Sequence, residues 1–108
     1  MLEKHHIVFK SQGGLDFELN YKLLESEDHR GPYGPHMNRK VDLVYKRELQ
    51  AKLEMVLHKD YYQIEELIKI LGLKEKQAYK AFRKLQMHKK GYKTQDIIIR
   101  LMGGRSYL

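Results

Sequence analysis

Cysteine and tryptophan are both absent from this chain of 108 residues. Without cysteine, the protein can form no disulfide, no thiolate zinc site and no cysteine nucleophile. Long apolar runs are also missing: the densest apolar patch is Ile97–Ile99, whereas a membrane helix needs about 18 apolar residues or more. Residues 3–6 are charged or imidazole side chains, where a signal peptide would need an apolar stretch. We therefore expect a cytoplasmic protein with no membrane segment.

Proline is scarce, and its position divides the chain. Both prolines lie, together with two glycines, in Arg30–Pro35. Proline lacks a backbone N–H and disrupts helices and central strands, so this stretch is predicted to be a loop. Ahead of it, the residue types of Ile7–Phe9 and Tyr21–Leu24 predict two short strands. Because a two-stranded hairpin is only marginally stable alone, another element must cover it.

Helical periodicity begins after this loop. Apolar residues recur mostly at spacings of three to five between Val41 and Leu57, which predicts an amphipathic helix that ends near His58. This helix is the natural cover for the predicted hairpin. We therefore group residues 1–58 as the first part of the protein.

Three shorter helices are expected in the second part, residues 59–108. Two of them span about residues 62–71 and 74–89, and only Gly72-Leu73 separates them, which is a helix-turn-helix pattern. The last is expected to begin near Thr94, with Thr94 as its N-cap. Together these elements predict an α+β protein. Its helical second part either packs with the first part as one unit or is loosely joined to it.

Positive charge is concentrated in the C-terminal half. Residues 1–46 carry 7 Lys+Arg against 7 Asp+Glu, whereas residues 47–108 carry 14 against 7, so the whole net charge of +7 arises there. The predicted 74–89 helix places its alanines and Phe82 on one face. The opposite face carries Lys76, Gln77, Lys80, Arg83 and Lys84. We expect the four cations to bind DNA phosphates, and the alternative is a merely solvated basic face.

Histidine is concentrated at the other end of the chain. His5, His6, His29 and His36 all lie in the first third. Two or three imidazoles brought together form a metal site, because neutral imidazole is a common metal ligand. Adjacent residues of a regular strand point to opposite faces, yet His5 and His6 would have to address one substrate group. We therefore expect this pair at an irregular strand start.

The first forty residues resemble the HNH endonucleases, which are nucleases of the ββα-metal fold, and in particular their small stand-alone members from phages and prophages. The resemblance rests on the His5-His6 pair, an asparagine 14 residues after His6 and a histidine nine residues after Asn20, and it covers roughly residues 4–40. It implies that His5 and His29 ligate a metal. It also implies that His6 is the general base that activates water, and that Asn20 fixes the loop and the base.

The third metal ligand departs from the family pattern. Many relatives place it one helical turn after the histidine that corresponds to His29, where this chain has Tyr33. We expect His36 to replace it from the loop, with Asn38 and Asp28 as alternatives. The other interpretation of His36 is an exposed loop residue. Relatives also often carry structural cysteines here, which this chain lacks, so the following helix must stabilise the hairpin.

The reaction that this resemblance implies is hydrolysis of DNA phosphodiester bonds, by nicking or by double-strand cleavage. It requires one divalent cation, for which we expect Mg or Mn first, with Zn or Ni as alternatives. A base removes a proton from water, and a cation stabilises the charge that grows on the phosphate. The alternative function is non-catalytic DNA binding by the helix-turn-helix, with a structural metal or none. A third possibility is an RNA-binding or assembly accessory protein. Both a monomer and a homodimer are compatible with the sequence.

Overall fold

The computed structural model describes all 108 residues and confirms a mixed α+β fold, with five α-helices and two small antiparallel sheets. None of the helices is both long enough and apolar enough to cross a membrane. In chain order, the elements are β1 (Leu2–His6), the 3-10 turns η1 (Lys10–Gln12) and η2 (Glu18–Asn20), β2 (Tyr21–Glu25), α1 (Ser26–Arg30), α2 (Arg39–Val56), β3 (Tyr61–Tyr62), α3 (Ile64–Leu71), α4 (Glu75–Phe82), β4 (Met87–His88), β5 (Gly91–Lys93) and α5 (Thr94–Leu101).

The first sheet is the antiparallel pair β1–β2, in which His6 lies opposite Tyr21. The second predicted strand is confirmed, but the first is wrong, because β1 ends at His6 and the chain bends at residues 7–8. Ile7 and Val8 are buried in the core. Their apolar character therefore reflects burial in a bend. A short apolar run in the sequence is compatible with either a buried bend or a strand, so it cannot tell the two apart.

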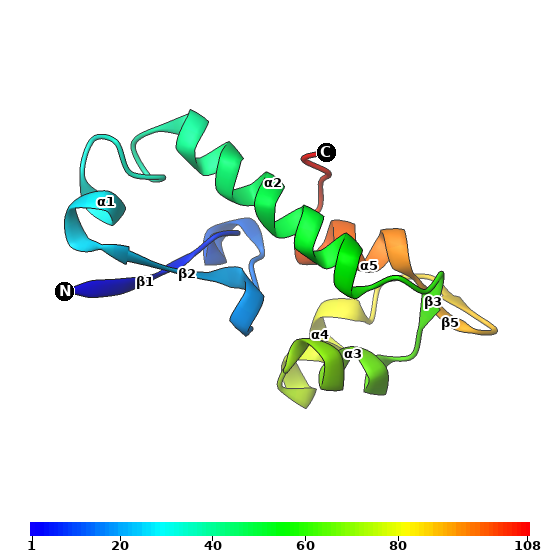
Figure 1. Cartoon of the computed structure of the whole chain (residues 1–108). Helices are drawn as coiled ribbons and strands as arrows, with labels where there is room; N and C mark the ends of the chain where they lie inside the picture. Colours follow the sequence, from blue (N-terminus) through cyan, green and yellow to red (C-terminus); the bar gives the residue numbers. More distant parts are fainter.

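Helix α2 crosses the molecule and joins its two ends (Figure 1). It begins at an Asn38 cap, whose Oδ1 accepts the N–H groups of the second and third helical residues at 3.1 and 3.4 Å. Leu49 and Leu53 are buried on its inner face, as the periodicity predicts. Val44 is an exception, with 49% of its surface exposed. The predicted long helix is confirmed, although its apolar face is narrower than expected.

The C-terminal helices are shorter than predicted. Helix α3 ends at Leu71 and is capped by Gly72, whose φ of 68° is left-handed, and α4 begins three residues later at Glu75. The predicted 74–89 helix is wrong beyond Phe82, because β4 and β5 form a hairpin there. At Gly91, with φ 124°, a Cβ atom would collide with the carbonyl oxygen of Tyr62. Strand β5 also pairs with β3, so the sheet order is β3-β5-β4.

One hydrophobic core contains side chains from both parts of the chain. Residues 1–58 contribute, among others, Phe17 and Leu53, and residues 59–108 contribute Phe82 and Ile97. Helix α2 contacts both η2 and α5. The hairpin that carries the histidines and the basic helical part therefore pack on a common core.

Candidate functional site

Three of the predicted site histidines come together from three different segments. His5 lies on β1, His29 on α1, and His36 in the turns between α1 and α2. One ring nitrogen from each residue lies within 4.8 Å of those of the other two, and the ring centroids are 4.9 to 5.0 Å apart. The turns after α1 return the chain toward β1, which is why His36 can meet residues so far from it in sequence. This group could hold a metal ion.

His5 is the buried member of the group. Only 1% of its surface is exposed, and its Nε2 atom has no hydrogen-bond partner. Burial, followed by the positive charges that His36 and His29 can carry, lowers the pKa of His5 to about 4. The ring is therefore neutral near pH 7. Because buried polar atoms are normally satisfied, the unpartnered nitrogen fits a metal ligand.

His29 is oriented by a carboxylate. Its Nδ1 atom donates to Glu3 Oε1 at 2.8 Å, and its Nε2 atom lies 3.0 Å from His36 Nε2. A carboxylate that accepts from one imidazole nitrogen leaves the lone pair on the other, which is the arrangement that metal-binding histidines use. The hydrogen bonds from His29 and then Arg30 lower the pKa of Glu3. Partial burial, followed by the nearby His29, lowers the pKa of His36.

The structure separates His36 from the two other candidates for the third ligand. The side chain of Asn38 is used as the N-cap of α2. Asp28 is exposed on α1 and lies outside the group of three ligand atoms. His36 therefore joins His5 and His29, and neither alternative does.

His6 faces the same pocket as the three histidines. It is the last residue of β1, so the expectation of an irregular strand start is corrected to a strand end, after which the chain bends. Both adjacent residues nevertheless line one pocket. The pocket has a volume of about 400 Å³ and is lined by Lys4, His5, His6, Phe9, Lys10, Ser11, His29 and His36.

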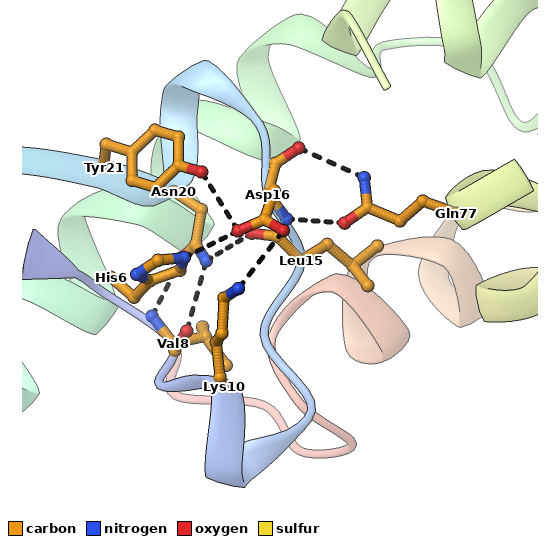
Figure 2. A network of polar contacts seen from close by, with 8 residues as sticks. All are labelled: His6, Val8, Lys10, Leu15, Asp16, Asn20, Tyr21 and Gln77. Carbon is orange, nitrogen blue, oxygen red and sulfur yellow. Dashed lines mark hydrogen bonds and ion pairs between the residues drawn. The ribbon is translucent and has the colours of Figure 1, made fainter. Parts of the chain in front are cut away.

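Asn20 holds the loop that follows β1. It is fully buried, and its Oδ1 atom accepts the N–H of Val8 at 2.8 Å. Its Nδ2 atom donates to the carbonyl oxygens of Val8 at 3.1 Å and Leu15 at 2.8 Å. These contacts are drawn in Figure 2. Asn20 therefore fixes the two ends of the loop, but no hydrogen bond joins it to His6.

Asp16 is the residue that contacts His6, and no pattern in the sequence predicted it. Its Oδ1 atom accepts from His6 Nε2 at 2.8 Å and from the Tyr21 hydroxyl at 3.0 Å, while Lys10 Nζ lies 3.5 Å from Oδ2 (Figure 2). The hydrogen bond from His6 is the largest influence that lowers the pKa of Asp16. The only local signal for such a residue is an acid just after Gly13-Gly14, which also suits an ordinary loop.

The cations on α4 and just after it are available to a ligand, although Arg83 and Lys84 follow the end of the helix at Phe82. The four side chains predicted to bind DNA phosphates are all exposed, and none of them takes part in an ion pair. They are Lys76, Lys80, Arg83 and Lys84. A groove of about 480 Å³ separates three of them from the loop after β1, and it is lined by Gly13, Gly14, Leu15, Gln77, Lys80, Ala81, Arg83, Lys84, Leu85 and Arg100. Gln77, expected on the outer face of this helix, instead contacts the loop.

No model of a known protein family, no curated protein and no solved structure matches this chain.

Proposed function

We propose that this protein is a metal-dependent endonuclease of the HNH type, which hydrolyses phosphodiester bonds of DNA. The observation that carries the proposal is the convergence of three imidazoles beside His6 in one pocket. The unpartnered Nε2 atom of buried His5 supports a metal ligand at this point. The order β1, β2, α1, with His5 on the first strand and His29 on the helix, supports the ββα-metal arrangement.

Each residue of the pocket has a separate role in the proposed hydrolysis. His5, His29 and His36 would hold the cation, which when bound supplies positive charge to stabilise the phosphate oxygens. His6 accepts a proton from water while the water oxygen bonds to phosphorus. One ester P–O bond breaks, and the departing oxygen takes up a proton. Asn20 keeps the loop beside His6 in place through its three hydrogen bonds.

The donor set supports a transition metal at this site. All three candidate ligands are imidazole nitrogens, and no carboxylate belongs to the group. Imidazole suits Zn²⁺ and Ni²⁺, whereas Mg²⁺ and Mn²⁺ prefer carboxylate, carbonyl and water oxygens. We therefore place Zn²⁺ or Ni²⁺ ahead of Mg²⁺ or Mn²⁺, which reverses the order expected from the sequence.

The exposed cations on α4 and just after it supply the surface that holds DNA. Phosphate contacts by lysine and arginine give most sequence-independent affinity for DNA. Lys80, Arg83 and Lys84 line the groove next to the loop that leads back to His6. The proposed substrate therefore lies across α4, with one phosphate in the histidine pocket.

A plasmid-nicking assay tests the proposal directly. Supercoiled DNA is incubated with the protein and Zn²⁺, Ni²⁺, Mn²⁺ or Mg²⁺, with and without EDTA. We expect cleavage that EDTA abolishes and that His6→Ala reduces by about 10²- to 10⁴-fold, the usual contribution of a positioned base. His58→Ala, which removes an exposed histidine outside the pocket, is the matched control and should cleave normally. No cleavage with any of the four metals would contradict the proposal.

Non-catalytic DNA binding is the second candidate function. The observation that favours it is the pair α3–α4, joined at Gly72, with an exposed basic second helix. Such a pair can place one helix in a DNA groove without any chemistry. Metal-dependent DNA binding without nicking in the same assay would support this function over the nuclease.

A further inference from the structure

A line of hydrogen bonds connects the basic helix α4 to the general base. Gln77 on α4 contacts the backbone of Asp16, and the Asp16 carboxylate contacts His6 (Figure 2). Gln77 and Asp16 are 61 positions apart in the sequence. Each of these contacts is 3.1 Å or shorter, so the connection has no gap between the helix and the imidazole.

The carboxylate determines which nitrogen of His6 carries the hydrogen. A carboxylate can only accept, so the 2.8 Å contact requires a hydrogen on His6 Nε2. In the neutral ring, the lone pair is then on Nδ1, and this is the nitrogen that can take a proton from water. Tyr21 and Lys10 hold the same carboxylate from two other directions. These contacts hold the Asp16 carboxylate beside the ring.

Gln77 fixes the backbone that carries this carboxylate. Its Oε1 atom accepts the Asp16 N–H at 2.7 Å, and its Nε2 atom donates to the Asp16 carbonyl oxygen at 3.1 Å. The backbone N–H and the backbone carbonyl of Asp16 are thus both held by the Gln77 side chain. Helix α4 also presents Lys80, and Arg83 is its C-terminal cap residue, so the phosphate-binding surface and the base are connected to the same element.

We propose that Asp16 is a positioning residue for His6, and that Gln77 couples its position to α4, so that DNA held on α4 meets a correctly oriented base. This inference rests on the proposed nuclease function. In this role Asp16 contacts neither the attacking water nor the phosphate, and its effect on the reaction passes entirely through His6. The coupling predicts losses in catalytic rate that leave the affinities for metal and DNA intact.

The tautomer of His6 gives a readout that requires no activity. Long-range ¹H–¹⁵N correlation spectra of the metal-free protein at pH 8 distinguish the two neutral forms, and His6→Gln identifies the signals. We expect hydrogen on Nε2 in the parent. Asp16→Asn should shift the ring toward the other tautomer, because a carboxamide can donate as well as accept. His6 with its hydrogen on Nδ1 in the parent would overturn the inference.

Cleavage kinetics give the second readout, with whichever of the four metals supports cleavage by the parent. Asp16→Asn should lower kcat by about 10- to 100-fold, as loss of an orienting partner typically does, while KM for DNA and the affinity for Zn²⁺ stay unchanged. Asp16→Glu should restore part of kcat. Gln77→Ala should lower kcat to a lesser extent, and Gln86→Ala, an exposed glutamine without hydrogen bonds, should behave as the parent.

The outcomes separate this inference from the proposed function. An inactive parent would overturn both. An active parent with unchanged kcat in Asp16→Asn and Gln77→Ala would overturn the coupling alone. Weaker Zn²⁺ binding by Asp16→Asn would also overturn it, because that result would identify Asp16 as a metal ligand. Thermal unfolding checks that each variant folds. If Asp16→Asn does not fold, Gln77→Ala decides: reduced kcat supports the coupling and unchanged kcat overturns it.

Discussion

At the scale of single residues, burial decides what the histidines of this protein can do. His5 is buried without a hydrogen-bond partner, whereas His29 is held by Glu3. A buried neutral imidazole is a good metal ligand but a poor site for a proton. Burial keeps the His5 ring neutral and able to bind a metal, and for the same reason it should make the stability of the metal-free protein fall at acidic pH.

The first prediction concerns the stability of the metal-free protein against pH. In the folded state, the pKa of His5 is lowered from 6.5 to about 4. Between these values the unfolded chain binds a proton that the folded protein does not, so the free energy of unfolding should fall as the pH drops from about 6.5 to about 4. The loss from His5 is at most about 3 kcal/mol. The lowered pKa of His36 acts in the same direction.

Urea denaturation at several pH values between 8 and 4 measures this effect. His5→Gln is the matched variant, because glutamine cannot take up a proton. Contributions from Asp16 and Glu3, whose lowered pKa values make stability fall only at more acidic pH, are common to both proteins. Parallel stability curves for the parent and His5→Gln would contradict the prediction.

The second prediction concerns the carboxylate that orients His29. Glu3→Gln should weaken Zn²⁺ binding by about 10- to 100-fold, since partners of metal-binding histidines typically contribute this much. Isothermal titration calorimetry at pH 7.5 or so gives the affinity. Glu27→Gln is the control, because Glu27 is an exposed acid on α1 whose side chain makes no hydrogen bond. Equal affinities for Glu3→Gln and the parent would remove Glu3 from the site.

At the scale of elements, two regions carry the two kinds of functional residue. The β1–β2 hairpin, α1 and the turns after it bring the histidines together, and α4 with the residues just after it presents the cations. One bound cation can hold one phosphate, whereas the exposed face of α4 can contact several. Each phosphate contact on duplex DNA contributes about −0.9 to the slope of log affinity against log salt concentration. Affinity for DNA should therefore depend on α4 more than on the histidine pocket.

The third prediction tests this division. Replacement of Lys80, Arg83 and Lys84 by glutamine should flatten the salt dependence of DNA binding by roughly two to three units, while cleavage at saturating DNA persists. Fluorescence anisotropy at several salt concentrations gives the slope. The control replaces three exposed lysines on other helices, Lys40, Lys52 and Lys69. An equal change in both triple variants would attribute the effect to net charge rather than to α4.

At the scale of the whole molecule, α2 connects the site to the rest of the protein. It packs on the segment before β2 and on α5, and the C-terminal segment returns toward it (Figure 1). There the Gln50 side chain forms hydrogen bonds with Ser106 and Tyr107. Close to the site, buried Lys46 pairs with Asp42 and lies 4.3 Å from the centre of the Phe9 ring. The pocket therefore depends on packing that extends along the whole helix.

The fourth prediction follows from this common core. Leu53→Ala should lower the free energy of unfolding by about 2–5 kcal/mol, because Leu53 is fully buried in α2 and truncation leaves a cavity. The unfolding curves from far-ultraviolet circular dichroism and tyrosine fluorescence should coincide in parent and variant. Met55→Ala, at an exposed position of the same helix, should have little effect. Two separate transitions would show instead that the two parts fold independently.

Most of the candidate site was predictable from sequence, because its residues belong to three short segments within the first 36 positions. His5, His29 and His36 meet as expected. Asp16 and Gln77 were not predictable. Neither residue type is distinctive at its position, and the contacts between them join segments 61 positions apart.

The sequence alone determined the features that depend on residue chemistry and local backbone preference. These are the α+β class, the loop at the two prolines, the long helix, the break between two helices at Gly72-Leu73 and the excess of cations after residue 46. Each arises from a side chain and its near neighbours, so a pattern in the chain is sufficient to predict it.

Only the tertiary structure decided the features that depend on distant partners. The bend at Ile7-Val8 exists because Asn20 holds the backbone there, and the 87–93 hairpin exists because β5 pairs with β3. The role of Gln77 likewise depends on the loop that packs against it. Helical periodicity and apolar character cannot reveal such partners. A buried bend and a buried strand both require apolar residues, so they look alike in the sequence. A glutamine likewise looks the same whether its side chain faces solvent or forms hydrogen bonds with a distant segment.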